Sequence, residues 1–215
     1  MTAINQLVGE IETLPSEYIQ EVIDIVNGQT EREKTAKGKI IYLEGVSSSG
    51  KTTLARKLQA RLSEPFFLLA GDMFWDMAPP PKSFENNVIF PKVESATINT
   101  LKLFPTLCIN VIIDFIPVGT DYLINNFIND PYEFPALYVN VTCPIEELRR
   151  REKERGNRQI GLAESQLAEL SPNIYDIIVD THNNSTEECA DKIIEMLNYP
   201  EKWTAFKSIW QQRTK

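Results

Sequence analysis

The sequence predicts an α/β domain in which a five-stranded parallel sheet is covered by helices on both faces, preceded by an N-terminal helical appendage. Two observations predict the sheet. Apolar runs alternate with helical patterns from Lys39 onward, and the first run leads through a glycine-rich loop into a helix. A polar segment before it, QTEREKTAKGK, predicts a linker. We therefore divide the chain into an appendage with linker (residues 1–38), a main domain (residues 39–199) and a tail (residues 200–215).

The appendage carries two apolar stripes at helical spacing. The first spans residues 4–11, and the second spans residues 19–26 and follows Pro15, which favours the first turn of a helix. Gly28 is suited to end the second helix. The stripes predict packing within the chain, or alternatively contact with a second copy or a partner protein.

The strands are predicted from short apolar runs, such as KIIYLEG and INVIID, that suit burial on both faces of a sheet. In chain order the predicted strands are residues 39–45, 66–72, 107–116, 136–143 and 175–181. Strands that alternate with helices pair in parallel through right-handed crossovers. Ligands of such sheets bind beyond the carboxyl ends of the strands, which is therefore where we expect the site.

The helices between the strands are predicted from apolar residues at intervals of three and four, as at Leu54, Leu58 and Leu62. The predicted helices are residues 52–62, 93–102, 145–155, 164–170 and 186–197. Ser185 and Glu188 have the spacing of a capping box at the start of the last one. The tail places three aromatic residues on one helical stripe, which predicts a helix packed on the domain, or alternatively an interface: Trp203, Phe206 and Trp210.

Composition excludes several classes of protein. The formal net charge of −8 and the pI near 4.9 argue against a protein whose main partner is nucleic acid or an anionic membrane. No apolar run is long enough to span a membrane, and the N-terminus lacks a secretory signal pattern. The three widely spaced cysteines predict buried thiols in a reducing compartment. We expect a cytoplasmic protein.

The loop GVSSSGKT, from Gly45 to Thr52, matches the pattern G-x-x-x-x-G-K-[ST]. Its position after a strand and before a helix favours phosphate binding over a simple Ser-Gly turn. No N-K-x-D motif for guanine is present, so ATP is the expected nucleotide. Lys51 would reach the outer phosphates, and the Thr52 hydroxyl would bind Mg²⁺. The residues expected to contact ATP are Gly45, Ser47, Ser48, Ser49, Gly50, Lys51, Thr52 and Thr53.

Two aspartates end predicted strands beside this loop. Asp114 is placed to bind Mg²⁺, with a capping role as the alternative. Asp72 could accept the proton of a substrate hydroxyl that attacks the terminal phosphoryl group, although it could also be a capping residue, and Asp76 is a rival. Nearby aromatic residues could line an apolar acceptor pocket together with the Pro79–Pro81 loop, or belong to the core: Phe74, Trp75, Phe84 and Phe90.

Five arginines lie between Arg149 and Arg158 in this otherwise acidic chain. A solvated helix would explain part of the run, because Glu147 and Arg151 are four residues apart in the favourable order, as are Glu154 and Arg158. The arginines continue past Gly156, however, which favours a lid that brings positive charge to the transferred phosphoryl group. We expect Arg151, Arg155 and Arg158 to be the catalytic members of this run.

Four segments together resemble the chloramphenicol phosphotransferase-like P-loop kinases: IIYLEGVSSSGKTTLARKLQ, the Gly71-Asp72 pair followed by Met77-Ala78-Pro79, REKERGNRQIG and YDIIVDTHNNSTEECA. The similarity covers residues 39 to 197. It implies the P-loop NTPase fold of nucleoside and shikimate kinases, with Lys51 as the phosphate lysine and Thr52 as the magnesium hydroxyl. It implies that Asp72 is the base for the substrate hydroxyl, and that Arg155 and Arg158 are lid arginines.

The chain departs from this family at two places. It has Asp114-Phe115 where the family tends to show two acidic residues, and residues 74–93, on the acceptor side, match poorly. The resemblance therefore implies an ATP- and Mg²⁺-dependent small-molecule O-kinase without naming chloramphenicol as its substrate. Two alternatives stay open: a zeta-toxin-like kinase of a nucleotide sugar, and a nucleotide-dependent switch that acts through the N-terminal helices.

Overall fold

The computed structural model describes residues 15, 18, 37–77, 89–115, 134–156, 160–169 and 174–213. The chain forms two compact units, residues 1–37 and residues 38–215. Of the first unit only residues 15, 18 and 37 are described, so the predicted apolar stripes lie outside the described residues. The division of the chain into three parts stays a prediction.

The second unit contains the parallel five-stranded sheet that the sequence predicts. Its strands are β1 (Ile40–Glu44), β2 (Phe66–Ala70), β3 (Asn110–Asp114), β4 (Ala136–Thr142) and β5 (Ile177–Asp180). They pair in the order β2-β3-β1-β4-β5, and every neighbouring pair is parallel. β1 is the central strand of the sheet. β3 and β2 lie on one side of it, and β4 and β5 lie on the other. The carboxyl end of β1 therefore lies at the point where the direction reverses, which is where such sheets bind ligands.

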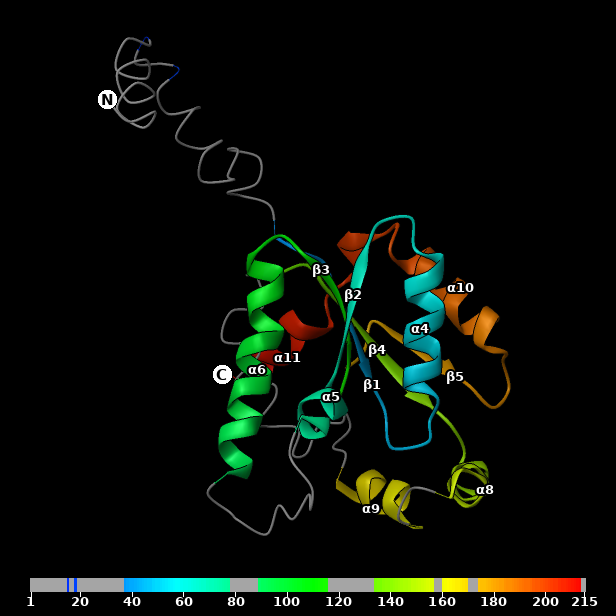
Figure 1. The fold of residues 1–215 in the computed structure, drawn as a ribbon. Helices are drawn as coiled ribbons and strands as arrows, with labels where there is room; N and C mark the ends of the chain where they lie inside the picture. Colours follow the sequence, from blue (N-terminus) through cyan, green and yellow to red (C-terminus); the bar gives the residue numbers. More distant parts are fainter. Residues whose placement is uncertain are drawn as a thin grey trace. The chain divides into compact units, whose positions relative to one another are not determined.

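Helices cover both faces of the sheet (Figure 1). The described helices are α4 (Lys51–Arg61), α5 (Gly71–Asp76), α6 (Phe90–Thr106), α8 (Ile145–Arg155), α9 (Leu162–Glu169), α10 (Thr186–Met196) and α11 (Ala205–Arg213), with a 3-10 turn η1 (Pro200–Lys202). Helices α4 and α10 lie on one face, and α6 and α11 lie on the other. Within the described part of the chain, no helix is both long and apolar enough to cross a membrane.

The core explains why β1 is the central strand. All five of its residues are buried, because both of its faces are covered. Ile41 and Leu43 pack with α4 and α10, whereas Ile40 and Tyr42 pack with α6 and α11. The tail packs on the domain as predicted: Phe206 of α11 is buried, and its ring stacks on Tyr138 with the centroids 4.5 Å apart.

Several predicted elements need correction. The second strand ends at Ala70, and Asp72 lies in the first turn of α5. A negative charge at this position is stabilised by the helix dipole. Helix α6 runs to Thr106 and is followed by a turn through Cys108, whose φ is 62°, so β3 begins only at Asn110. Burial of all three thiols was a wrong prediction. Cys189 is buried, but Cys143 is half-buried and Cys108 is exposed.

Candidate functional site

The glycine-rich loop connects the end of β1 to the start of α4, at the carboxyl edge of the sheet (Figure 1). Gly50 has a φ of 94°, a left-handed conformation that glycine adopts without strain. A side chain at Gly45 would not fit, because its Cβ would lie 2.5 Å from the carbonyl oxygen of Val141. Both glycines of the motif are therefore required by the path of the loop.

Polar groups of this loop are buried in a way that suits a phosphate chain. Lys51 is only 5% exposed, and its Nζ donates a hydrogen bond to the carbonyl oxygen of Val46 at 2.9 Å. The hydroxyl oxygens of Ser48 and Ser49 are buried and have no hydrogen-bond partner among the described residues. Unpaired buried hydroxyls are costly in a folded protein unless a ligand pairs with them. The loop, with a buried cation at the start of a helix, thus fits the phosphates of a nucleotide.

The predicted magnesium residues lie together. The Thr52 hydroxyl donates a hydrogen bond to Asp114 Oδ2 at 2.5 Å, and Asp114 is only 8% exposed. Thr52 is on α4 and Asp114 ends β3, which pairs directly with β1. Among the described residues there is no group of three or more His, Cys, Asp or Glu side chains that could by itself hold a metal ion. One hydroxyl and one carboxylate nevertheless fit Mg²⁺, which usually takes its other oxygen ligands from phosphates and water.

Asp72 follows the strand next to this pair at the same edge of the sheet. Ala70, the last residue of β2, is in register with Asp114 of β3, and Asp72 follows two residues later on α5. Both Asp72 and its rival Asp76 are exposed. Of the proposed acceptor wall, Phe74 is half-buried, whereas Pro79–Pro81, Phe84 and the side chains of Trp75 and Phe90 lie outside the described residues. The role of these residues stays a prediction.

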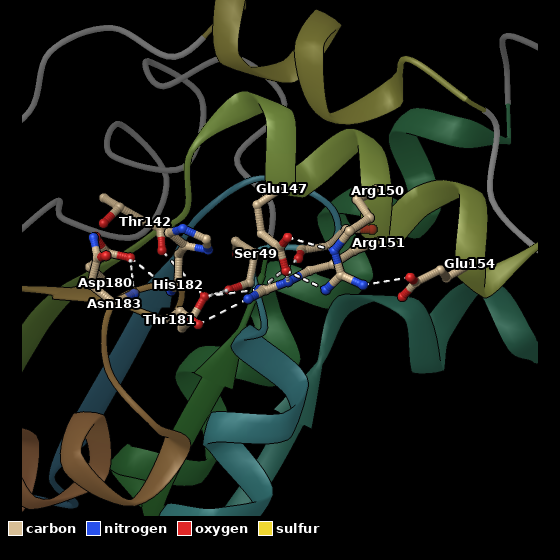
Figure 2. Close-up of polar contacts among 11 residues, drawn as sticks. Ser49, Thr142, Glu147, Arg150, Arg151, Glu154, Asp180, Thr181, His182 and Asn183 are labelled. Atoms are coloured by element: carbon tan, nitrogen blue, oxygen red, sulfur yellow. Dashed lines mark hydrogen bonds and ion pairs between the residues drawn. The ribbon is translucent and has the colours of Figure 1, made fainter.

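Arg151 of α8 joins the phosphate loop to the turn after β5 (Figure 2). Its guanidinium donates to the hydroxyl of Thr181 at 3.0 Å, to the carbonyl oxygen of Thr181 at 2.9 Å and to that of Ser48 at 3.4 Å. The Thr181 hydroxyl in turn donates to the carbonyl oxygen of Ser49 at 2.7 Å. Glu147 completes the contact through an ion pair with Arg151 at 2.8 Å. In this arrangement Arg151 connects protein segments to one another.

The other arginines of the run differ in their partners. Arg150 pairs with Glu147 at 2.6 Å and with Glu154 at 2.5 Å. Hydrogen bonds from Arg150 and Arg151 lower the pKa of Glu147 to about 2, which keeps this carboxylate charged. Arg155 is exposed in the last turn of α8 and makes no ion pair with any residue that the structure describes. Arg158 lies outside the described residues. The catalytic roles of Arg151, Arg155 and Arg158 stay predictions.

Two polar residues of the site were not predicted from the sequence. Glu152 is 1% exposed, and its carboxylate accepts hydrogen bonds from the backbone N–H groups of Ala163 at 2.7 Å and Gly161 at 2.9 Å. It thereby holds the start of α9. Gln166 of α9 accepts a hydrogen bond from the backbone N–H of Ser47 at 2.7 Å. Glu152 is surrounded by charged residues in the sequence and looks solvent-exposed there, so the sequence offered no signal for either role.

A third unpredicted residue is Glu44, the last residue of β1. Its side chain is buried and accepts hydrogen bonds from the hydroxyls of Tyr138 and Tyr175. Burial, reinforced by the charge of Glu44, raises the pKa of Tyr138 well above its usual value, so this hydroxyl stays a donor. Tyr175 lies between α9 and β5 in the chain. The network therefore ties the segment after α9 to the residue that precedes the phosphate loop.

We expect Glu152→Ala to loosen α9 without unfolding the sheet. The substitution leaves two helix-terminal N–H groups without their carboxylate, a change that costs about 1–3 kcal/mol per unsatisfied buried group. Hydrogen exchange followed by mass spectrometry should show faster exchange in α9. Glu154→Ala is the matched control, because Glu154 is an exposed carboxylate on the same helix. Unchanged protection of α9 in Glu152→Ala would contradict this role.

The chain is similar in sequence to a known protein family and to a known enzyme. A family model described as chloramphenicol phosphotransferase-like protein matches residues 38–198. The adenylyl-sulfate kinase of Clostridium acetobutylicum is 27% identical over 177 residues, which cover 77% of this chain and 87% of that protein.

Two solved structures of kinases are similar to this chain. One is the APS kinase of Mycobacterium tuberculosis in complex with AMPPNP and APS, with a TM-score of 0.60, 17% identity and coverage of 76% of this chain and 99% of that one. The other is the shikimate kinase of Acinetobacter baumannii in complex with shikimate, with a TM-score of 0.54, 20% identity and coverage of 78% and 96%. At these identities the two likenesses show the shared fold alone.

Proposed function

The chain belongs to the chloramphenicol phosphotransferase-like family, and on this premise we propose that it is an ATP- and Mg²⁺-dependent kinase that phosphorylates a hydroxyl group of a small molecule. One observation carries the proposal: the phosphate loop with Lys51, the Thr52–Asp114 pair and Asp72 all lie at the carboxyl edge of adjacent strands. ATP as the phosphoryl donor is also the reason to place the reaction in the cytoplasm.

ATP is the first substrate in this proposal. The N–H of Ser47 donates to Gln166, so the other N–H groups of the loop and those of the first turn of α4 would hold the phosphates. Lys51 would contact the outer phosphates. The Thr52 hydroxyl and the Asp114 carboxylate would hold Mg²⁺, which when bound neutralises charge on the β- and γ-phosphates. The unpartnered hydroxyls of Ser48 and Ser49 support this assignment, because a phosphate oxygen would satisfy them.

The acceptor is a hydroxyl-bearing small molecule that approaches from the side of α5. Asp72 accepts the hydroxyl proton as the hydroxyl oxygen forms a bond to the γ-phosphorus. The bond from the γ-phosphorus to its bridging oxygen breaks, and ADP leaves with the electron pair. Arg155 and Arg158 would neutralise charge on the transferred group, whereas Arg151 would do so only after it releases Thr181.

The test is transfer of phosphate from ATP to a panel of hydroxylated antibiotics, nucleotide sugars, nucleosides, shikimate and adenylyl sulfate, with mass spectrometry of the products. We expect one acceptor class to gain a single phosphate in a Mg²⁺-dependent reaction. The Lys51→Ala variant is the control for contaminating kinases. ATP hydrolysis that no acceptor changes would contradict the proposal and would favour a nucleotide-dependent switch.

A further inference from the structure

Helix α9 contacts the phosphate loop at two neighbouring residues. Ala163, near the start of α9, packs with Val46 and Leu148 in a small buried apolar cluster. Three residues further along the same helix, Gln166 Oε1 accepts a hydrogen bond from the backbone N–H of Ser47 at 2.7 Å. Val46 and Ser47 are consecutive residues of the loop. Helix α9 therefore holds the peptide between them through a packing contact on one residue and a hydrogen bond on the other.

The position of α9 is itself determined by α8. The buried Glu152 carboxylate accepts hydrogen bonds from two backbone N–H groups at the start of α9. On the exposed side, Arg149 pairs with Glu164 of α9 at 2.7 Å. With both contacts in place, Gln166 approaches the loop from a helix that α8 holds at two points.

The peptide unit between Val46 and Ser47 is held at both of its polar ends. Its carbonyl oxygen accepts the hydrogen bond from Lys51 Nζ at 2.9 Å, and its N–H donates to Gln166. The C=O and N–H of a trans peptide are coplanar and point in opposite directions. Rotation of this peptide would therefore break both hydrogen bonds together. Gln166 also lies on the side of the peptide that faces away from Lys51 Nζ, so it leaves the lysine side clear for phosphate.

We propose that Gln166 is a positioning residue for ATP binding: by holding the N–H of Ser47 it fixes the Val46–Ser47 peptide so that the Val46 carbonyl orients Lys51. The inference rests on the proposed function, in which Lys51 contacts the outer phosphates. Gln166 acts through the lysine, because loss of its amide removes one of the two hydrogen bonds that hold the peptide whose carbonyl accepts from Lys51. The effect on ATP affinity therefore requires the lysine to be present.

A double-mutant cycle on ATP affinity tests this coupling, with titration calorimetry in Mg²⁺ as the readout. Gln166→Met keeps the length of the side chain but removes its hydrogen-bonding groups. We expect it to raise the Kd for ATP about tenfold in the wild-type background and less than about twofold in the Lys51→Ala background. The matched control is Ser165→Ala, an exposed neighbour on α9, which should leave the Kd unchanged in both backgrounds.

The cycle separates positioning from its alternatives. Additive effects of the two substitutions would overturn the proposal, because they would mean that Gln166 contributes independently of Lys51. A wild-type Kd in Gln166→Met would overturn it as well. If Gln166→Met fails to fold, Gln166→Asn replaces it in the same cycle. The asparagine side chain is one methylene shorter, so its amide no longer reaches the Ser47 N–H, and the expected changes in Kd are the same.

The proposed function can fail separately from this inference. A wild-type protein that binds ATP and shows the coupled cycle, but phosphorylates no acceptor, would contradict the transfer reaction and retain the role of Gln166. A wild-type protein that does not bind ATP would contradict both.

Discussion

Replacing Lys51 by alanine is expected to abolish phosphotransfer and to weaken ATP binding. Lys51 is the buried cation of the phosphate loop, at the first residue of α4. Hydrogen bonds to charged groups contribute about 1.5–3 kcal/mol, so the Kd for ATP should rise by roughly 10- to 100-fold. The rate of transfer should fall by about 10²–10³-fold more, because the lysine also stabilises charge in the transition state. Calorimetry and a coupled ADP-release assay measure the two effects.

Lys57→Ala is the matched control for this experiment. Lys57 lies on the same helix, but it is half-buried at the surface and pairs with Glu187 of α10 at 2.6 Å. Its removal deletes the same charge and should change neither ATP affinity nor turnover. Wild-type affinity and turnover in Lys51→Ala would show that the loop does not bind the phosphates as proposed.

The second large effect is expected for Asp72→Asn, which should lose transfer while it keeps ATP affinity. Asparagine has the same shape as aspartate but cannot accept the hydroxyl proton. A general base contributes typically about 10²–10⁴-fold to the rate, so kcat should fall by this factor. The Kd for ATP should change less than about twofold, because Asp72 is on α5 and not in the phosphate loop. Single-turnover kinetics with an acceptor found by the panel assay would measure the loss.

Asp76→Asn provides the comparison on the same short helix. Both aspartates are exposed, and the two substitutions remove equal charge, so a purely electrostatic effect would appear in both variants. Loss of transfer only in Asp72→Asn would support its role as base. The reverse result would assign that role to Asp76, and wild-type turnover in both variants would remove α5 from the mechanism.

Much of the fold could be predicted because its signals are local. The five strands and the helices between them follow from apolar periodicity, and their type was correct even where the ends differed by a few residues. The extension of α6 past Lys102 and the turn at Cys108 were missed, because no apolar pattern marks where a helix gives way to a turn. The short helix α5 was missed for a related reason: six residues are too few to show helical periodicity.

The candidate site likewise has parts that could be predicted from the sequence and parts that could not. The phosphate loop was recognisable because its glycines, lysine and threonine lie within a single short segment, from Gly45 to Thr52. The placement of Asp114 near this loop followed from the rule that parallel strand ends meet at one edge. The partners of Arg151 were only half predicted. Its pair with Glu147 follows from their spacing on one helix, whereas its bonds to Thr181 depend on how α8 lies over the sheet.

The sequence by itself determined the parallel α/β architecture, the phosphate loop and the kinase family, because each can be recognised from short segments whose pattern is local, even where several such segments are needed. Only the tertiary structure decided that Gln166 contacts Ser47, a residue 119 positions away, and that Glu152 is buried against the start of α9. The physical reason is that the sequence around a backbone N–H or a carboxylate does not indicate which distant residue it will bond to. Its partner is chosen by the packing of helices that the hydrophobic core positions.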